Sequence, residues 1–479
     1  MMAVTGSGDG GPARGDGGTD GERAPRSVPP ATGATPWRPE PEPDPRRAGR
    51  LLGRARVLAG TAPPGPFRPA FWRSPIRGPW LTAVLGLVLL FGITVVFVTG
   101  LLSYAAYNPG LGALNDKTPG KGLLGFYLFT WPTHPYWLYR LTQGVHVTLG
   151  IVLIPVVLAK LWSVVPKLFT WPPALSPAHA LERLSLILLV GGVLFELATG
   201  VLNIQLDYVF PGSFYTLHFY GAWVFMAAFA AHAVLRLGRM WRAVRSRTLR
   251  SVLATDAAHT APEPPDPYGL VAPAPASPTM SRRGALGLVG AGSLALLVVT
   301  AGQSIGGSLR RTALLAPHDR DPRPGPNGFQ INKSAAAVGI RASDIGPGWR
   351  LEIHGVQKLI FTHAQLLTMD QHTARLPIAC VEGWSTDDQH WSGLRLADLA
   401  ALAGMPHATS VLVESVQRTG AFRRVLLAGN QISNPLSLLA LHVNGAPLSP
   451  DHGHPARVIV PANPGVNNTK WVRRLTFRT

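Results

Sequence analysis

Five long apolar stretches dominate the hydrophobic pattern of this chain. They cover residues 80–102, 137–162, 184–206, 214–237 and 285–309. A helix rises ~1.5 Å per residue, so about 20 apolar residues cross a hydrocarbon layer ~30 Å thick. Trp or Tyr stands near an end of each of the first four stretches, where such rings favour the headgroup zone. We therefore expect an all-α transmembrane four-helix bundle plus one further transmembrane helix.

Residues 310–479 carry a different pattern. Short runs of alternating polarity occur at 349–353, 411–416 and 457–460, and residues 394–402 have helical periodicity. The Asn444-Gly445 pair is typical of a hairpin turn. This mixture predicts an α+β domain after the last apolar stretch.

The composition agrees with a membrane protein. Only 14% of the 479 residues are charged and 46% are apolar, whereas ordinary soluble domains carry about 25% charge. Residues 1–79 are rich in Gly, Pro and Arg and are expected to be disordered. The domains expected after them are the bundle at 80–240, a Pro/Ala-rich cytoplasmic linker at 241–284, the fifth helix at 285–309 and the α+β domain at 310–479.

The distribution of charge orients these segments. Arginines crowd before the first stretch and after the fourth, whereas the loops 103–136 and 207–213 hold only Lys117 and Lys121 as basic residues. By the positive-inside rule the N-terminus is cytoplasmic, and five crossings place residues 310–479 outside the cytoplasmic membrane. The net charge of +19 lies mostly in these flanks and not on a folded face, so no nucleic-acid partner is expected.

The fifth stretch follows Ser281-Arg282-Arg283-Gly284-Ala285-Leu286. This block resembles a twin-arginine export signal placed internally, with Ala285 where the pattern usually has Phe. The resemblance implies the twin-arginine export machinery as a partner, a route that carries folded, cofactor-loaded cargo. The alternative is a pair of flanking arginines that obey the positive-inside rule.

Histidines inside apolar stretches are candidates for function because a polar ring in hydrocarbon is costly. His218 and His232 are fourteen residues apart, which puts them about 40° apart on one helix face and ~21 Å apart along its axis. Depth pairs His146 with His218 on the outer side and His179 with His232 on the inner side. Facing imidazoles suit the two axial positions of a haem iron; the alternative is that each histidine only bonds a helix carbonyl.

With this histidine layout, residues 137–237 resemble the cytochrome b561-like membrane subunits. That resemblance implies b haems, two if both pairs bind one, and electron exchange with quinones. Arg140 and Arg183 are candidates to neutralise haem propionates or to extend to the membrane interface. Glu196 is a candidate to relay quinone protons or to bond a neighbouring helix.

Cys380, the single cysteine, excludes an intrachain disulfide. A thiolate is a soft ligand for a redox metal, and a buried apolar cysteine is the ordinary alternative. Its context is Cys380-Val381-Glu382-Gly383-Trp384, followed by Trp391-Ser392-Gly393 and, later, by Asp451-His452-Gly453-His454-Pro455-Ala456-Arg457 and Lys470-Trp471. These blocks, in this order over residues 327–479, resemble the molybdopterin-binding domain of the sulfite oxidase superfamily.

The resemblance implies a role for each matching residue. Cys380 ligates molybdenum and is the catalytic site. The pterin and its phosphate are held by His452, Arg457 and Lys470, with Asn468 and Thr469 beside them, and also by Asn332 and Ser415. A phosphate requires such a set of cationic and polar donors.

The chain departs from sulfite oxidases proper, because Val-Glu-Gly-Trp-Ser stands where they have an arginine-containing segment. It looks more like the methionine-sulfoxide-reductase branch. The sequence stops soon after Trp471, so no immunoglobulin-like dimerisation domain is expected. A zinc hydrolase that uses His452 and His454, or His363 and His372, is a weaker alternative because no acidic general base stands at a helical spacing beside either pair.

We therefore expect a membrane-bound molybdopterin-dependent oxidoreductase. A small oxo-donor or oxo-acceptor substrate would react at Cys380-bound molybdenum, and b haems would exchange electrons with the quinone pool in the lipid bilayer. The reaction expected first is reduction of an S-oxide or N-oxide, and the second choice is oxidation of a small substrate. The alternative from another class is a haem b electron carrier whose outer domain is a non-catalytic partner-binding module.

Overall fold

The computed structural model describes residues 62–116, 118, 129–173, 176–204, 214–266, 269–316 and 326–479, without the side chains of residues 178, 179 and 182. Residues 59–479 form one compact unit. Residues 1–61, most of the predicted N-terminal segment, lie outside the described residues. Lys117 and Lys121, in the loop after the first stretch, also lie outside them.

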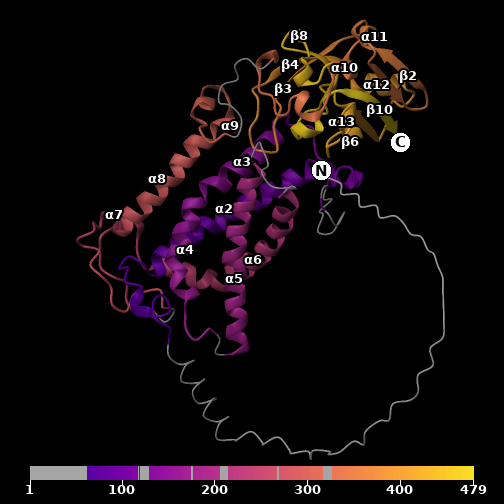
Figure 1. The fold of residues 1–479 in the computed structure, drawn as a ribbon. Coiled ribbons are helices and arrows are strands. Elements are labelled where there is room, and N and C mark those ends of the chain that lie inside the picture. The colour runs from indigo at the N-terminus through magenta and orange to yellow at the C-terminus, as the bar shows by residue number, and fades with distance from the viewer. Residues whose placement is uncertain are drawn as a thin grey trace, which may run out of the picture. The chain divides into compact units, whose positions relative to one another are not determined.

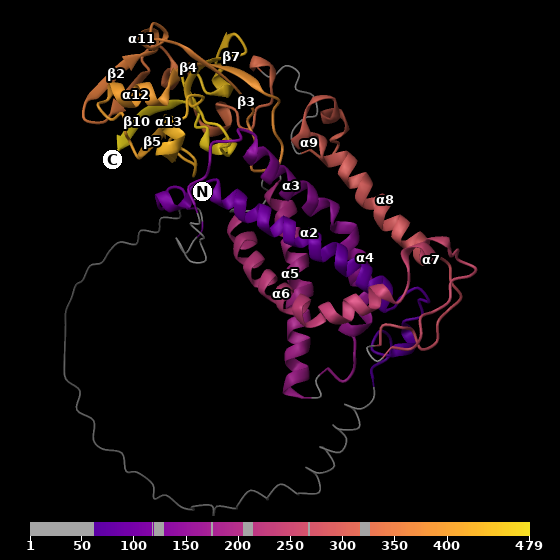
Figure 2. The same ribbon diagram turned by 180° about the vertical axis from the view of Figure 1, so that it is seen from behind.

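Long helices occupy the apolar stretches (Figures 1 and 2). They are α2 (Pro79–Ala105), α3 (Leu138–Val152), α4 (Ile154–Leu168), α5 (Pro177–Asn203), α6 (Tyr215–Arg245) and α8 (Arg282–Thr300). By length and composition, four helical segments among the described residues can each cross a membrane, and the bent pair α3–α4 makes a fifth. This agrees with the five expected stretches.

The second stretch is not the single helix that the pattern predicts. It breaks between Val152 and Ile154, and the axes of α3 and α4 differ by 40°. Pro155, at the start of α4, has no N–H to donate and its ring clashes with the preceding turn, so the helix cannot run straight through.

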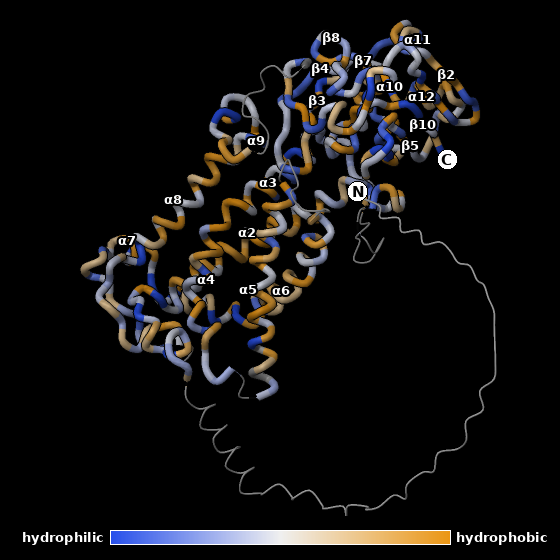
Figure 3. The backbone as a smooth tube through the Cα atoms, viewed as in Figure 1, coloured by the Kyte–Doolittle hydropathy of each residue, from blue (hydrophilic) through white to orange (hydrophobic). Residues whose placement is uncertain are grey.

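The helices pack as a bundle with an apolar exterior. Residues of α2, α4 and the following segments share a core around Trp80, Leu85 and Val157. Large apolar side chains also point outward, and Phe91, Val234 and Leu235 are about three-quarters exposed at 74%, 76% and 75%. Figure 3 shows the hydrophobic colour along α2 and α8. Exposed apolar patches of this kind mark surfaces that meet a membrane or another protein.

The two flanks of the bundle are more ordered than the sequence suggests. In the segment before α2, Phe67 packs edge-on against Phe169 with ring centroids 5.5 Å apart, so the expected disorder does not extend to residues 62–78. In the Pro/Ala-rich linker the buried Glu263 carboxylate accepts a hydrogen bond from the Trp80 backbone N–H at 3.2 Å and lies 3.5 Å from Arg282. A short helix, α7 (Leu249–Ala254), precedes it.

The C-terminal domain is α+β, as predicted, and contains two sheets. The first has the order β2 (Lys358–Thr362), β1 (Arg350–His354), β10 (Val472–Arg478), β5 (Ser410–Ser415) and β6 (Arg424–Ala428). The second has the order β3 (His372–Leu376), β4 (Gln389–Arg395), β7 (Leu438–Val443) and β8 (Ala446–Pro447), with β9 (Arg457–Ile459) also on β7. Only the β1–β10 pair is parallel among the described strands.

Short helices cover the sheets. They are α10 (Ala342–Ile345), α11 (His363–Leu367), α12 (Leu396–Leu402) and α13 (Gly429–Ser433). The alternating strand patterns place Leu351, Val413 and Leu475 in one core, each fully buried. The Cys380 turn follows a second core, which includes Leu376 of β3 and Trp391 of β4.

Candidate active site

Cys380 lies in a tight turn between β3 and β4. Its backbone N–H donates to the Trp384 carbonyl at 2.8 Å, and its own carbonyl accepts from the Gly383 N–H at 3.1 Å. Gly383 has φ +92°, a conformation that other residues rarely adopt. The turn therefore fixes the direction of the thiol through backbone bonds.

The thiol is buried, with Cys380 only 3% exposed, but its surroundings are polar. Sγ lies 3.5 Å from Glu382 Oε2, and the same oxygen accepts from Trp384 Nε1 at 2.7 Å. Burial, followed by the negative charge of Glu382, raises the pKa of the Cys380 thiol well above its ordinary value. A thiol with a raised pKa is protonated at neutral pH, so a metal would have to displace the proton.

Arg457 lies at the start of β9 and is buried. Nη1 donates to the His452 carbonyl at 3.3 Å, the guanidinium lies 5.6 Å from the Trp391 ring centre, and Nε is buried without a hydrogen-bond partner. Burial lowers the pKa of Arg457 to about 9. A buried guanidinium with an unused N–H is costly unless an anion binds it.

Lys470 brings a second cation to this region. Its ammonium donates to the carbonyls of Asp451 at 2.7 Å and Lys333 at 2.9 Å. Burial and then the positive charge of Arg457 lower its pKa well below the usual value, against smaller opposite contributions from Asp451 and Cys380. Among the described residues no carboxylate forms an ion pair with Lys470 or Arg457.

His452, Asn468 and Thr469 flank these cations and are nearly fully buried. The His452 ring packs on Phe329 with centroids 3.8 Å apart, and its Nδ1 lies 3.1 Å from Ser449 Oγ. Asn468 Oδ1 accepts from the Val460 N–H at 3.0 Å, whereas its Nδ2 is buried without a partner.

Asn332 and Ser415 contact the peptide backbone. Asn332 Oδ1 accepts from the Lys333 N–H at 2.8 Å. Ser415, at the end of β5, donates through Oγ to the Lys470 carbonyl at 2.8 Å. Asn332 therefore holds the segment that carries Lys333, and Ser415 holds the segment that carries Lys470. The Lys470 ammonium donates to the Lys333 carbonyl.

Together these groups fit an anionic cofactor. The buried Arg457 and the half-buried Lys470 have no carboxylate partner among the described residues, and Lys470 lies in one electrostatic neighbourhood with Arg457 and the Cys380 thiol. Arg457 Nε and Asn468 Nδ2 are buried without a hydrogen-bond partner. Such a set is unfavourable by itself because each unsatisfied buried polar group costs about 1–3 kcal/mol. A phosphate-bearing group that accepts their hydrogen bonds removes that cost.

The zinc alternative fits less well. His363 and His454 do approach one another, with ring centroids 5.3 Å apart, but His452 turns toward Phe329 and His372 lies 3.3 Å from Asp398. The described residues contain no group of three or more His, Cys, Asp or Glu side chains arranged to hold a metal ion.

The Cys380 turn rests directly on the helices. Gln143 of α3 donates to the Val381 carbonyl, and Ser304 of α9 (Gly302–Ile305) donates to the Gly383 carbonyl. Ser385 completes the contact, because its N–H donates to the Gln303 carbonyl at 2.9 Å and its hydroxyl donates to the Ser304 carbonyl at 2.8 Å.

The outer histidine pair comes together as predicted. The rings of His146 on α3 and His218 on α6 have centroids 6.1 Å apart and are inclined by 83°. His146 Nδ1 lies 2.9 Å from the Val96 carbonyl, and His218 Nδ1 lies 3.0 Å from both Glu196 Oε2 and Thr199 Oγ1. These bonds use Nδ1 and leave Nε2 for a metal, the usual arrangement of a ligating histidine. The carbonyl bond of the alternative interpretation is present as well.

The other helix residues have varied outcomes. His232 lines a cavity between α2, α4, α5 and α6, whereas the side chain of His179 lies outside the described part. Glu196 bonds a neighbouring helix through His218, the second of its two expected roles. Arg140 donates to the Ser304 carbonyl at 2.8 Å, and Arg183 to the Leu168 carbonyl at 2.9 Å, so both cap helix ends.

Sequence reasoning missed three features of these sites. The first is the Glu382 carboxylate beside Cys380, and the second is the pair of hydrogen bonds that Gln143 and Ser304 donate to the Cys380 turn. The third is Lys160, which lines the cavity with His232. Glu382 was visible two residues after the cysteine. Nothing in the sequence marks Gln143 and Ser304 as partners of the turn. Gln143 is 238 residues before Val381, and Ser304 is 79 residues before Gly383.

Comparison with known proteins agrees with the geometry. Residues 339–479 match the family described as "Oxidoreductase molybdopterin binding domain". The C-terminal part of this chain is therefore a molybdopterin-binding oxidoreductase domain of the sulfite oxidase type. The match begins after the last apolar helix.

Individual relatives support that class. The chain is 31% identical over 209 residues to the protein-methionine-sulfoxide reductase catalytic subunit MsrP of Gluconobacter oxydans, covering 40% of this chain and 65% of that protein. It is 28% identical over 131 residues to an uncharacterized oxidoreductase, YuiH, of Bacillus subtilis, which is 27% of this chain and 65% of the relative. It is 35% identical over 96 residues to sulfite oxidase of Arabidopsis thaliana, which is 17% of this chain and 24% of the relative. The chain thus spans at most 65% of the length of these relatives.

Proposed function

We propose that this protein is a membrane-bound, molybdopterin-dependent oxidoreductase that transfers an oxygen atom to or from a small substrate outside the cytoplasm. Its electrons would pass through b haem in the helix bundle to or from quinone. The observation that carries the proposal is the buried Cys380 thiol in one electrostatic neighbourhood with Arg457 and Lys470, cations that have no carboxylate partner among the described residues.

Each residue of the site has a distinct role in this proposal. Cys380 holds the metal as a thiolate, and its turn fixes the direction of Sγ. Arg457 and Lys470 bind the phosphate of the pterin, and the free Asn468 Nδ2 donates to the same group. His452 and Thr469 line the pterin position, whereas Asn332 and Ser415 hold the backbone around Lys470.

When bound, the molybdenum centre supplies two-electron oxygen-atom transfer. Reduction of an S-oxide consumes two electrons and two protons and yields the sulfide and water. The Glu382 carboxylate, which lies 3.5 Å from Sγ, can accept the proton that the thiol loses when it becomes a ligand.

The contact between the Cys380 turn and α3 supports electron exchange with the bundle. Gln143, which donates to the Val381 carbonyl, is three residues before His146. The pair of His146 and His218 therefore lies about one helical turn along α3 from the residue that contacts the Cys380 loop. Haem iron, held by Nε2 of His146 and His218, would carry single electrons to or from quinone in the lipid.

Reduction of an S-oxide or N-oxide with quinol electrons is the direction we favour. The Val-Glu segment after the cysteine and the 31% identity to a methionine-sulfoxide reductase catalytic subunit support it. Export by the twin-arginine machinery through Arg282 and Arg283, with the fifth helix as an anchor in the cytoplasmic membrane, belongs to the same proposal.

The test is a redox-dye assay of the purified full-length protein with S-oxides, N-oxides and sulfite, run in both directions, together with metal analysis. We expect molybdenum in the protein, oxide-dependent oxidation of reduced dye, and loss of that activity in Cys380→Ser. A protein with b-type absorbance but no molybdenum, and with activity unchanged in Cys380→Ser, would instead be the haem carrier with a non-catalytic outer domain.

A further inference from the structure

The outer and inner halves of the bundle repeat the same spacing. On α6, His218 and His232 are fourteen residues apart. The chain from α3 to α4 has His146 and, fourteen residues later, Lys160. Fourteen residues advance a helix by ~21 Å and return to nearly the same face. The same interval therefore separates His146 from Lys160 and His218 from His232, although the first interval crosses the bend between α3 and α4.

A third helix repeats the interval. On α2, Gly100 faces His146, because a Cβ added there would lie 2.9 Å from Cε1 of the imidazole. Gly86, fourteen residues earlier, faces Lys160, because a Cβ added there would lie 2.9 Å from the Nζ atom. In both halves a glycine gives room to the nitrogen-bearing side chain of the neighbouring helix.

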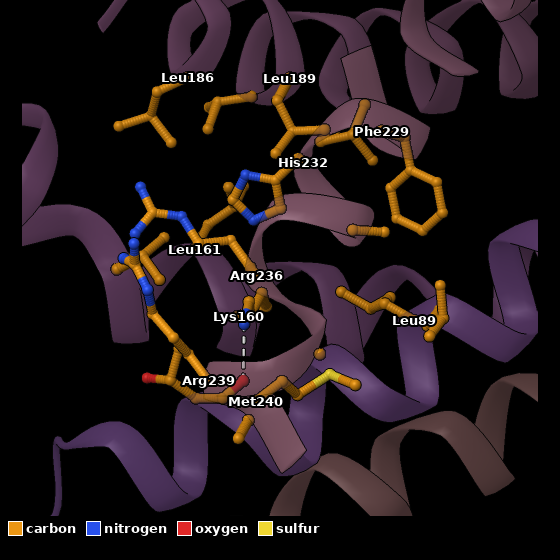
Figure 4. A pocket seen from close by; sticks show the side chains of 18 of the residues that line it. Leu89, Lys160, Leu161, Leu186, Leu189, Phe229, His232, Arg236, Arg239 and Met240 are labelled. Atoms are coloured by element: carbon orange, nitrogen blue, oxygen red, sulfur yellow. Dashed lines mark hydrogen bonds between the residues drawn. The ribbon is translucent and has the colours of Figure 1, made fainter. Parts of the chain in front are cut away.

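Lys160 and His232 enter the same cavity. It has a volume of about 440 Å³ and lies between α2, α4, α5 and α6, within the ~300–1,000 Å³ that cofactor pockets occupy. Figure 4 shows the His232 ring and the Lys160 side chain among the leucines and Phe229 that line it, with the ammonium bonded to a backbone oxygen on the side away from the ring. Arg236 and Arg239 line one side, where the carboxylates of an amphiphilic cofactor would find cations.

Among the described residues, one hydrogen bond of Lys160 competes with such a role. Nζ donates to the Thr82 carbonyl at 2.6 Å, a single bond for a group with three N–H donors. A neutral amine has a lone pair and is a nitrogen ligand for iron, as imidazole is. His179 lies in the first turn of α5 (Pro177–Asn203), and its side chain lies outside the described residues.

We propose that Lys160 is the axial partner of His232, so that the bundle holds a second haem with one histidine and one lysine ligand. This inference rests on the proposed function, because it assumes that the bundle binds haem. Ligation requires the amine to lose its proton, so the inner site is the more sensitive of the two to acid.

Haem content and electron paramagnetic resonance of the oxidised, detergent-purified full-length protein test the assignment. We expect two haems per chain and two low-spin signals. Lys160→Ala should lose one low-spin signal, with that haem either released or converted to high spin, while the signal that depends on His146 and His218 persists. Lys160→His should retain both haems and change the g values of one signal only.

Two matched variants separate ligation from packing. Lys167→Ala removes another lysine of the same cavity lining and should leave both signals unchanged, as should His179→Ala. Persistence of both low-spin signals in Lys160→Ala, or loss of one in His179→Ala, would overturn the proposal.

A single haem in the wild type that depends on His146 and His218 would also overturn it, and the proposed function would stand. A wild-type protein without any haem would instead defeat the proposed electron route through the bundle.

Discussion

Gly383, in the turn that carries Cys380, packs against Val147, the residue after His146. A Cβ added to Gly383 would lie 2.7 Å from the Val147 Cβ, closer than two such atoms can approach. The two candidate redox sites therefore meet through one glycine and one valine, without an intervening side chain at this point.

Gly383→Ala should weaken this contact. The new methyl group meets Val147 and the backbone has φ +92°, so we expect a cost of about 1–3 kcal/mol and a displaced turn. Electron exchange between the site and the bundle should slow, which stopped-flow absorbance of the haem measures. Gly445→Ala is the matched control: φ is +80° but the added Cβ has no neighbour within 4 Å. Equal rates in the two variants would show that the contact with Val147 is not used.

Glu382→Gln should make the cofactor-free thiol more reactive. The Glu382 charge is the second cause, after burial, of the raised pKa of Cys380, and glutamine removes that charge while it can still accept a bond from Trp384. The pH midpoint of Cys380 alkylation should fall but stay above that of an exposed cysteine, because burial remains. Asp388→Asn, a change in the same loop away from the thiol, provides the control, and an unchanged midpoint in Glu382→Gln would contradict the expectation.

The stability of the cofactor-free protein should rise with pH in the alkaline range. Lys470 has a lowered pKa in the folded state, so between that value and the ordinary ~10.4 the unfolded chain binds a proton that the folded chain does not. The free energy of unfolding then increases with pH through this window. Thermal unfolding from neutral to alkaline pH measures it, and Lys470→Met should flatten the slope. A loaded protein should show less slope, since a bound phosphate restores the charged ammonium.

Arg282→Lys with Arg283→Lys should leave the C-terminal domain in the cytoplasm if the pair is an export signal. Arg282 also donates to the Ala261 carbonyl at 3.0 Å and the Pro75 carbonyl at 3.2 Å, contacts that a lysine cannot all reproduce. Protease accessibility of the outer domain in spheroplasts reports its side of the membrane. Arg247→Lys with Arg250→Lys keeps the same charge count elsewhere in the basic flank. Normal export of the Arg282/Arg283 variant would refute the signal.

The sequence by itself determined the order of the elements and the chemistry of the C-terminal domain. Length and apolarity are local properties, so the apolar stretches predicted helices near their observed bounds, and the blocks around Cys380, His452 and Lys470 predicted the molybdopterin-binding domain. The spacing on α6 and the depth of His146 predicted the pair of rings that lies 6.1 Å apart.

Only the tertiary structure decided which distant groups meet. The partners of the Cys380 turn, Gln143 and Ser304, lie on different helices. The hydrogen bonds that they donate to the turn leave no periodic pattern in the sequence. The bend at Pro155 changes where α4 points, and Lys160 of α4 lines the same cavity as His232, a meeting that depth along the chain did not predict. Residue type and hydrophobic periodicity determine local secondary structure. Contacts between distant residues depend on how the helices bend and pack against the C-terminal domain.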